Sequence, residues 1–415
     1  MTKYDIVVYG ATGFTGIYVV QQIATSSVSE GVTFAVAGRS EAKLRKNIRA
    51  TPIIIADSAD ESSLVEMAKQ AKVIINAVGP YRLYGEAVVK AAVENGASHV
   101  DISGEPAWIE KMALNYGETA RKNGVYVVSA CGWDSIPADL GVNFLKKNFG
   151  GDLNHVESFV QLHQGEAGYS FNAGTYQTLI LGLSSVMTDR LGPIRKQLMP
   201  EKITKGSVKV PKRPNMWPIQ EKELQGYALP FPGADKSIIN RSQYYDATVK
   251  NRRPIHMETY IRLSSQFWAV LLGLWVTVFG FLVQFKFARK ILQTYPDACS
   301  FYMFKNSGPT EEQMAQASFT YWFFGYGYNR QLPLTEQHEG KPNRKVVATC
   351  KGPDAGYIAT SGCVLSSALT ILKDQASLPK EGGVYTTAAA FGESKIYDYL
   401  KAFDVTYQIE AEESL

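Results

Sequence analysis

The sequence predicts an α/β protein: a doubly wound parallel sheet comes first, and a second, α+β domain with a mixed sheet follows. Three observations carry this prediction. The β-branched run Ile6–Val8 leads directly into a glycine-rich turn and an apolar-periodic helix. Further strand-like runs alternate with helix-like stretches to about Ser129. After about Asn148, strand-like runs are separated by longer irregular pieces.

In the first part of the chain, six expected strands alternate with expected helices. The expected strands are Ile6–Val8, Thr33–Ser40, Ile53–Ala56, Val73–Asn76, His99–Ile102 and Val125–Ser129. The expected helices are Phe14–Ile23, Ser62–Gln70, Ala87–Glu94 and Trp108–Lys122. The last two end at Asn95-Gly96 and Asn123-Gly124, which are natural left-handed helix terminators. Because the strands of a parallel sheet end at one edge, the loops after them should face one crevice.

The turn from Gly10 to Gly16 has the pattern of a dinucleotide phosphate cradle. Gly10 allows a tight turn, Gly13 lets backbone amides approach a pyrophosphate, and Gly16 lets the helix pack closely on the strand. The unpaired N–H groups of the helix N-terminus supply the anion site. A purely structural glycine turn is the alternative. The expected cofactor contacts in this turn are Gly10, Ala11, Thr12, Gly13, Phe14 and Thr15.

The end of the second strand favours NADPH over NADH. It carries Gly38, Arg39 and Ser40, and it lacks the acidic residue that would accept a hydrogen bond from an NAD ribose. A guanidinium and a hydroxyl can bind the 2′-phosphate through charge-assisted hydrogen bonds. The alternative is that Arg39 is a surface arginine at a strand end.

The remaining loops of the crevice supply further cofactor contacts. Asp57 is expected near the adenine or its ribose, with a helix cap as the alternative. Cys131 lies in a predicted site loop, where a small buried residue is the alternative. The backbone wall near the ribose and nicotinamide is expected from Ala77, Val78, Gly79 and Pro80.

Three side chains of these loops are candidates for proton transfer. Tyr81 is placed to stack on the cofactor or to donate a proton. Asp134 and Ser135 precede Pro137, which suits the first turn of a helix, so either one is a proton donor or simply the helix N-cap.

Length and composition limit the possible number of domains, the binding partners and the cellular compartment. A chain of 415 residues is long enough for two domains: a Rossmann domain over 1–147 and a substrate or dimerisation domain over 148–387. Residues 388–415 are expected to pack back on the first domain. The net charge of +4 without a basic tract argues against nucleic acid. Four widely spaced cysteines without a CxxC pair predict a reducing compartment and no metal site. The first strand begins within a few residues of Met1, so no secretory signal is expected.

The second domain is expected to mix strands, helices and one long ordered loop, Met199–Asp235, whose aromatic residues need burial. Its expected strands are Val156–His163, Thr259–Leu263 and Lys345–Lys351, with Thr406–Glu410 as the last strand of the chain. Its expected helices are Tyr176–Met187 and Thr360–Leu372.

The segment Phe267–Phe285 is apolar apart from Thr277 and Gln284. As a helix it would extend roughly 28 Å, about the thickness of a bilayer core. A single span would place two halves of one domain on opposite sides of a membrane, so we expect this segment to attach to a lipid monolayer or membrane surface without crossing it. A wholly buried core helix or a dimer-interface helix is the alternative, and the sequence leaves a homodimer open.

The motifs of this chain resemble those of the saccharopine dehydrogenase-like oxidoreductases of animals, essentially from end to end. The resemblance is carried by Tyr9–Gly16, Ala37–Ser40, Asn76–Tyr81, Asp101–Glu105, Cys131–Gly141, Gly226–Asp235, Ser318–Tyr328, Gly352–Ser361 and Ala388–Gly392. It implies an NAD(P)-binding oxidoreductase at a lipid droplet or at the cytosolic face of a membrane. Bacterial and plant relatives include trans-acting enoyl reductases, which reduce a carbon–carbon double bond in a lipid-like substrate.

The candidate substrate segments argue against a saccharopine-like ligand. Gln164–Thr175, Gly226–Asp235 and Ser318–Tyr328 are rich in Gly, Phe and Tyr and contain no arginine, which favours a hydrophobic substrate over one with several carboxylates. We therefore expect an NADPH-dependent reductase, possessing enoyl or carbonyl reductase activity, of a lipid- or terpenoid-like molecule. The alternatives are a nucleotide-binding scaffold or sensor of lipid surfaces without turnover, favoured by the absence of an obvious catalytic triad, and a saccharopine-type amino-acid dehydrogenase.

Overall fold

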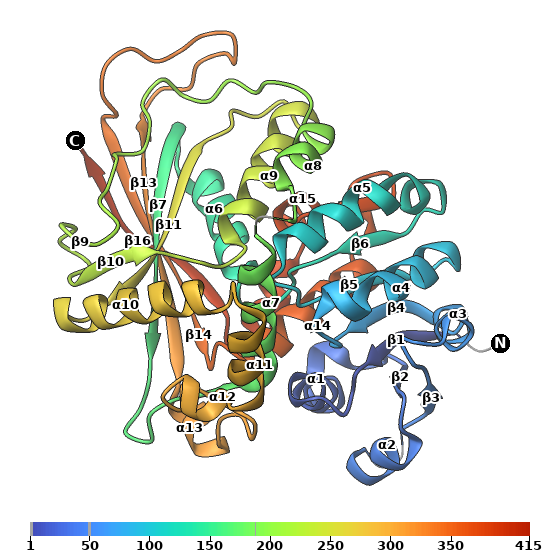
Figure 1. Cartoon of the computed structure of the whole chain (residues 1–415). Coiled ribbons are helices and arrows are strands. Elements are labelled where there is room, and N and C mark those ends of the chain that lie inside the picture. The colour runs from blue at the N-terminus through green and yellow to red at the C-terminus, as the bar shows by residue number, and fades with distance from the viewer. Residues whose placement is uncertain (1–2, 49–50, 187) are drawn as a thin grey trace. The chain divides into compact units, whose positions relative to one another are not determined.

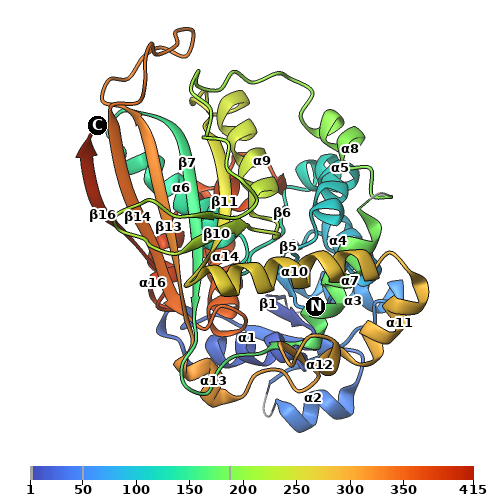
Figure 2. The same cartoon turned by 60° about the vertical axis from the view of Figure 1, so that its left-hand side comes forward.

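The computed structural model describes residues 3–48, 51–186 and 188–415, which divide into two compact units. Unit 1 consists of Met1–Ile136, Arg190–Pro200 and Pro353–Thr406. Unit 2 consists of Pro137–Asp189, Glu201–Gly352 and Tyr407–Leu415. Figure 1 and Figure 2 show the elements of both units from two directions.

Unit 1 is built on a seven-stranded parallel sheet with the order β15-β6-β5-β4-β1-β2-β3. Its strands are β1 (Tyr4–Tyr9), β2 (Phe34–Gly38), β3 (Ile53–Ile55), β4 (Ala71–Asn76), β5 (Ser98–Asp101), β6 (Tyr126–Val128) and β15 (Gly383–Tyr385). Its helices are α1 (Phe14–Thr25), α2 (Glu41–Asn47), α3 (Glu61–Lys69), α4 (Tyr81–Glu94), α5 (Pro106–Lys122), α8 (Leu191–Leu198), α14 (Ile358–Lys373), α15 (Thr387–Phe391) and α16 (Ile396–Lys401).

The order of the first six strands is that of a doubly wound dinucleotide-binding sheet, so the predicted fold class is confirmed. Ile6, Val7 and Val8 of β1 have no exposed surface, as expected for a strand in the middle of a sheet that is covered on both faces. All strands run in one direction, so the loops that follow them leave from one edge of the sheet, which we call the carboxyl edge.

The domain boundaries differ from those expected from the sequence. Pro353–Thr406 belongs to unit 1, although 148–387 was expected to form one second domain. The reason is α14, which is buried along its length and packs against α1, β4 and β5. Strand β15 then pairs with β6. At the end of the chain, 388–406 belongs to unit 1 as expected, whereas Tyr407–Leu415 belongs to unit 2 and lies in its sheet.

Unit 2 is built on a mixed seven-stranded sheet with the order β16-β14-β13-β7-β11-β10-β9, together with the short parallel pair β12–β8. Its strands are β7 (Asp152–His163), β8 (Phe171–Asn172), β9 (Trp217–Pro218), β10 (Tyr227–Pro230), β11 (His256–Leu263), β12 (Phe304–Lys305), β13 (Ser318–Tyr328), β14 (Arg344–Pro353) and β16 (Thr406–Ser414). Its helices are α6 (Ile136–Asn148), α7 (Ala173–Ser185), α9 (Asp235–Thr248), α10 (Gln266–Leu282), α11 (Lys286–Thr294), α12 (Pro296–Cys299) and α13 (Glu311–Gln316). Met187, the expected end of the helix from Tyr176, lies outside the described residues.

Strand β13 lies in the interior of this sheet, between β14 and β7, and was not expected as a strand. Its side chains Phe319, Tyr321, Phe323 and Phe324 are all buried, so they fill the core of unit 2 and do not line a substrate pocket as the sequence suggested. Helix α6 packs directly on it, since a Cβ at Gly141 would lie 2.2 Å from the ring of Phe323. A strand with aromatic residues on both faces lacks the alternation by which half-buried strands are recognised.

The apolar segment Phe267–Phe285 forms α10 and the turn that leads into α11. Phe279 and Val283 are buried, whereas Phe267 and Phe281 are exposed. A helix wholly buried in the core is therefore the wrong interpretation of this segment. Across the described residues, no helix has both the length and the apolar character that spanning a bilayer requires.

Candidate functional site

The turn between β1 and α1 has the backbone of a phosphate cradle. Gly10 has a φ of +88°, a left-handed conformation that favours glycine. A Cβ at Gly16 would lie 2.2 Å from the carbonyl oxygen of Gly10, so only glycine lets α1 begin this close to the turn. The residues that the structure brings together here are those predicted: Gly10, Ala11, Thr12, Gly13, Phe14 and Thr15.

The amide groups of this turn divide into two sets. Gly10 and Ala11 donate to the carbonyl of Ala37, and Gly13 donates to the carbonyl of Gly10 at 2.9 Å. Among the described residues, no side chain caps the first turn of α1, whose N-cap residue is Gly13. The N–H groups at the start of α1 therefore point out of the turn and can bind an anion. A dinucleotide pyrophosphate fits this cradle, because glycine at positions 10 and 16 allows the tight turn and close helix start that leave these amides uncapped.

The end of β2 places Arg39 beside the cradle. Gly38 is the last residue of β2, which pairs with β1 up to Tyr9↔Ala37, so Arg39 follows at the carboxyl edge. Arg39 is exposed, and it forms no salt bridge within the part of the chain that the structure describes. The hydroxyl of Ser40 caps α2 by accepting a hydrogen bond from the Lys43 amide, and its own proton remains able to donate to a phosphate.

Asp57 has a local role in the structure. It is half-buried after β3, and its carboxylate accepts a hydrogen bond from the Ala59 amide at 3.0 Å. The N-cap of α3 is Asp60, so Asp57 does not take the helix-cap position that was the alternative. An adenine or ribose contact of Asp57 stays a prediction.

The loop after β4 closes over the cradle. The amide of Ala77 donates to the carbonyl of Tyr9, and the amide of Val78 donates to the side chain of Asn76. A Cβ at Gly10 would lie 2.7 Å from Cγ2 of Val78. The first two residues of the predicted wall, Ala77 and Val78, therefore lie against the phosphate turn, and Gly79 and Pro80 continue from them to the start of α4.

Tyr81 is held away from solvent. Its side chain is 5% exposed, and its hydroxyl donates to the carbonyl of Asn76 at 2.8 Å and accepts from the amide of Ile102. Burial, with the nearby Asp101 charge, raises the pKa of Tyr81 well above its ordinary value. These contacts contradict the proton-donor role expected from the sequence, because both the hydroxyl proton and an acceptor site are used inside unit 1. Tyr81 instead joins the loops after β4 and β5.

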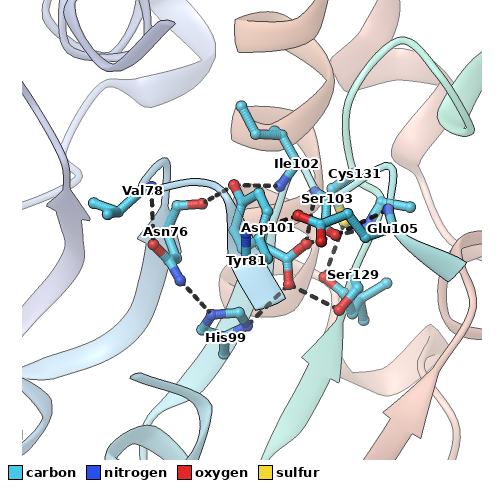
Figure 3. Close-up of polar contacts among 12 residues, drawn as sticks. Asn76, Val78, Tyr81, His99, Asp101, Ile102, Ser103, Glu105, Ser129 and Cys131 are labelled. Atoms are coloured by element: carbon cyan, nitrogen blue, oxygen red, sulfur yellow. Dashed lines mark hydrogen bonds and ion pairs between the residues drawn. The ribbon is translucent and has the colours of Figure 1, made fainter. Parts of the chain in front are cut away.

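A buried polar network connects the loops after β4, β5 and β6 (Figure 3). Its centre is Asp101, the last residue of β5, which accepts hydrogen bonds from the Ser103 amide, the Ala130 amide and the Ser129 hydroxyl. Nδ1 of His99 lies 3.6 Å from Oδ2 of Asp101. Burial raises the pKa of Asp101 to about 7, and burial lowers the pKa of His99 to about 3. The network thus contains a neutral imidazole beside a carboxyl group that is hard to ionise.

Glu105 extends this network to the start of α4. Its carboxylate is buried, accepts the Tyr81 amide at 2.8 Å and pairs with the guanidinium of Arg82 at 2.8 Å. Its own amide donates to the hydroxyl of Ser103. The three loops are therefore fixed relative to one another by side chains that were not predicted as site residues. Their signal in the sequence is the run Asp101–Glu105, which the resemblance included without assigning roles.

The loop after β6 presents Asp134 at the carboxyl edge. Asp134 is half-buried, and a Cβ at Gly104 would lie 2.9 Å from its Oδ2, so its carboxylate lies over the glycine of the loop after β5. Ser135 is buried and directly precedes α6, where an N-cap residue stands. Cys131 is also buried, and burial raises the pKa of its thiol. Its side chain therefore fits the alternative of a small buried residue, and a cofactor contact through its backbone stays a prediction.

The start of α14 completes this edge of unit 1, and the sequence did not predict it. The hydroxyl of Thr360 accepts a hydrogen bond from the Trp133 amide, and the hydroxyl of Ser361 donates to the carbonyl of Thr15. The ring of Tyr357 packs 4.5 Å from that of Phe14. The carboxylate of Asp354 accepts hydrogen bonds from the amides of Tyr357 and Ile358 at the start of the helix. The motif Gly352–Ser361 was visible in the sequence, but nothing local places it beside a turn more than 300 residues earlier.

Comparisons with known proteins agree with this geometry. Residues 6–128 match the family model of the saccharopine dehydrogenase NADP binding domain. A "lipid droplet localized protein" of Caenorhabditis elegans is 71% identical over the full length of both chains. The human saccharopine dehydrogenase-like oxidoreductase is 39% identical and covers 98% of this chain and 97% of its own. The expected cofactor, NADP(H), is therefore confirmed.

Two more distant likenesses bear on activity and fold. A Mycobacterium tuberculosis protein with the name "Putative trans-acting enoyl reductase" is 32% identical over 198 residues, which is 45% of this chain and 46% of its own. The structure of the L-Glu-forming saccharopine dehydrogenase of Saccharomyces cerevisiae superposes with a TM-score of 0.54 at 13% identity, covering 98% of this chain and 100% of its own. At that identity the likeness shows the fold alone.

Proposed function

The chain belongs to the saccharopine dehydrogenase-like oxidoreductases, and from that premise we propose that it is an NADPH-dependent reductase of a hydrophobic, lipid- or terpenoid-like substrate at the surface of a lipid droplet. The observation that carries the proposal is the cradle at the carboxyl edge of unit 1, in which Gly10 and Gly16 let the turn pack closely against Val78 and the start of α1, whose first turn has no side-chain cap. When bound there, NADPH supplies a hydride to an unsaturated or carbonyl carbon. The names of the enoyl reductase and lipid-droplet relatives support the substrate class and the location.

The protein residues have separate tasks in this proposal. The amides at the start of α1 bind the pyrophosphate, and Arg39 with Ser40 binds the 2′-phosphate. Ala77–Pro80 bounds the ribose and nicotinamide side. The network around Asp101 holds that loop in position. Because its members are buried and hydrogen-bonded inside unit 1, their task is to orient the loops and not to contact substrate.

Asp134 is the proposed proton donor. A hydride added to a double bond leaves negative charge that a positioned acid must neutralise, and such an acid contributes about 10²–10⁴ in rate. Asp134 is half-buried in the loop after β6, with its carboxylate over Gly104 at the carboxyl edge. Ser135 is buried and directly precedes α6, so of the two residues it is the one in the N-cap position.

The function is tested with NADPH deuterated at the transferred position. Purified protein is incubated with lipid-droplet extract, and the lipid products are searched by mass spectrometry for one added deuterium. We expect labelled lipid and NADPH consumption. A parallel incubation with 2-oxo acids and amino acids tests the saccharopine-type alternative. Label in those products would overturn the substrate class, and NADPH binding without label in any product would leave the scaffold or sensor function.

The proton donor is tested with Asp134→Asn. We expect kcat to fall at least about tenfold while the NADPH dissociation constant is unchanged, because a group that acts in the transition state need not affect ground-state binding. Asp60→Asn is the matched control, since Asp60 is an exposed carboxylate at the N-cap of α3. Full turnover in Asp134→Asn would remove Asp134 from the mechanism and leave a water molecule as the proton source.

A further inference from the structure

Helix α10 has two apolar faces, and only one of them is covered. On the inner face, Phe279 and Val283 are buried in a cluster with Tyr176 of α7 and Phe304 of β12. The ring of Phe279 lies 5.2 Å from that of Tyr176 and stacks at 4.9 Å on that of Trp275. This face anchors the helix to unit 2.

The outer face of α10 is a stripe of exposed large side chains at intervals of three and four residues. Phe281, for example, is 65% exposed. The stripe consists of Phe267, Leu271, Leu274, Val278, Phe281 and Phe285, and it is flanked by the exposed side chains of Trp268, Val270 and Val276. A surface helix of a globular protein carries polar residues on this face, and a helix that is apolar all round is normally buried. An exposed apolar surface of this kind marks a site of interaction.

The exposed surface continues beyond α10. In α11, Ala288 and Leu292 are buried while Phe287 is 71% and Ile291 50% exposed. A turn after α12 adds Phe301, which is 82% exposed, and Tyr302 beside it. Both residues of this turn have positive φ angles, of 52° and 60°. We call α10, α11 and the turn Phe301-Tyr302 the apolar platform; its helices are visible in Figure 2.

The two polar residues of the segment Phe267–Phe285 have hydrogen-bond partners within the chain. The hydroxyl of Thr277 donates to the carbonyl of Gly273 at 2.7 Å, one turn earlier in the same helix. The side-chain amide of Gln284 donates to the carbonyls of Gly280 and Leu183. Burying a polar group without a partner is costly, so these internal bonds let the outer face enter a hydrocarbon phase at little cost. A protein partner, by contrast, would be recognised partly through polar groups that it pairs with.

The charges on the platform have one sign. Lys286 and Lys290 are exposed at the start of α11, and Arg289 between them donates to the carbonyl of Val283. The sequence from Gln266 to Thr294 contains no Asp or Glu. A second copy of the chain would bring the same cations and no acidic partner from these helices. Anionic phospholipid headgroups are complementary to this arrangement.

We propose that the apolar platform lies in the phospholipid monolayer of a neutral-lipid droplet, with α10 and α11 parallel to the surface and the phenylalanines inserted below the headgroups. This inference rests on the droplet location in the proposed function and identifies the protein surface that binds the droplet. Lys286 and Lys290 contact the headgroups, while the inner face of α10 remains packed on α7 and β12.

The test is flotation of the purified full chain with artificial droplets that have a triolein core and a monolayer of phosphatidylcholine and phosphatidylserine. We expect wild type to float with the droplets and Leu271→Ser/Leu274→Ser/Phe281→Ser to lose most binding. A matched triple variant, Leu114→Ser/Val249→Ser/Leu334→Ser, removes three exposed apolar side chains elsewhere and should float as wild type does. Lys286→Gln/Lys290→Gln should lower the affinity about tenfold, and only when phosphatidylserine is present.

NADPH titration of each variant separates this inference from the proposed function. Unchanged NADPH affinity shows that the variant is folded and that the cradle is intact. If wild type binds NADPH but does not float, the inference is overturned while the reductase proposal stands. Equal binding to bilayer vesicles of the same phospholipids would overturn the commitment to a droplet. A wild-type dimer without lipid that becomes a monomer in the triple platform variant would make the platform a dimer interface instead.

Discussion

The carboxyl edge of unit 1 and the apolar platform of unit 2 are opposites in how they use their side chains. At the edge, polar groups are buried and paired inside the chain: Asp101 alone accepts three hydrogen bonds. On the platform, large apolar groups such as Phe281 and Phe287 are exposed. The buried polar groups of the edge are paired within the chain, so this region is stable without another molecule. It binds a ligand by complementary shape. The second region exposes surface that water disfavours, so it depends on an external phase.

The largest expected effect tests whether the edge is as rigid as its contacts indicate. Gly16→Ala places a Cβ 2.2 Å from the Gly10 carbonyl oxygen, so α1 must move away from the turn. We expect NADPH affinity to fall about 100-fold and the free energy of unfolding by about 1–3 kcal/mol. Fluorescence titration and urea unfolding measure the two quantities. Gly117→Ala in α5 is the control, because a Cβ there meets open space and should be neutral or stabilising. Wild-type affinity in Gly16→Ala would mean that the turn is more adaptable than the buried network beside it.

A smaller effect is expected from the polar side of the cradle. Arg39→Ala should weaken NADPH binding tenfold or more, equivalent to about 1.5–3 kcal/mol for a charge-assisted phosphate contact, and leave NADH binding unchanged. Arg45→Ala is matched, since Arg45 is an exposed arginine of α2 that pairs with Glu41. Titration of both variants with both cofactors gives the comparison. Equal wild-type affinity for NADPH and NADH would contradict the assignment of Arg39 to the 2′-phosphate.

The smallest effect concerns pH and the buried network. The pKa of Asp101 is raised to about 7, so between about pH 4 and 7 the folded state keeps a proton that the unfolded state has released. This group therefore stabilises the fold at low pH, and that contribution is lost as the pH rises through 7. His99, with its pKa lowered to about 3, acts in the opposite direction between about pH 3 and 6.5, because the unfolded imidazole binds a proton there.

Asp101→Asn removes the contribution of Asp101 and leaves that of His99. The free energy of unfolding of this variant should therefore rise relative to wild type as the pH increases from about 4 to 7. Urea unfolding at several pH values measures it. Asp60→Asn should give a small change of the opposite sign, since the pKa of that exposed carboxylate is held below its usual value by hydrogen bonds from Ser62 and Ser63. A parallel pH dependence of Asp101→Asn and wild type would show that Asp101 titrates normally in spite of its burial.

The same contrast explains what the sequence could predict. The β1–α1 turn was predictable because its requirements are local: a strand, three glycines and a helix within a dozen residues. The apolar character of Phe267–Phe285 was equally visible. Which face of α10 is covered was not, because burial of Phe279 depends on Tyr176 and Phe304 from other parts of the chain.

The roles of individual loop residues were harder to predict for a related reason. Tyr81 lies in the loop after a predicted strand, as an active-site residue would, yet its hydroxyl bonds to the backbone of Asn76 and Ile102. Thr360 and Tyr357 reach the edge only because α14 packs on α1. Sequence spacing predicts which loops share an edge, but it does not indicate how a side chain from a distant segment uses the hydrogen-bonding groups there.

The late return of Pro353–Thr406 to unit 1 has a consequence during synthesis. The segment leaves the ribosome more than 200 residues after Ile136, a delay of roughly 10 to 40 seconds at ordinary translation rates. Until then, the side of α1 that meets α14 lacks its partner, and β6 lacks its neighbour β15. During this delay the nascent sheet has an unpaired edge strand, and one apolar face of α1 is uncovered. Unit 1 can therefore complete its folding only when nearly all of the chain has been synthesised.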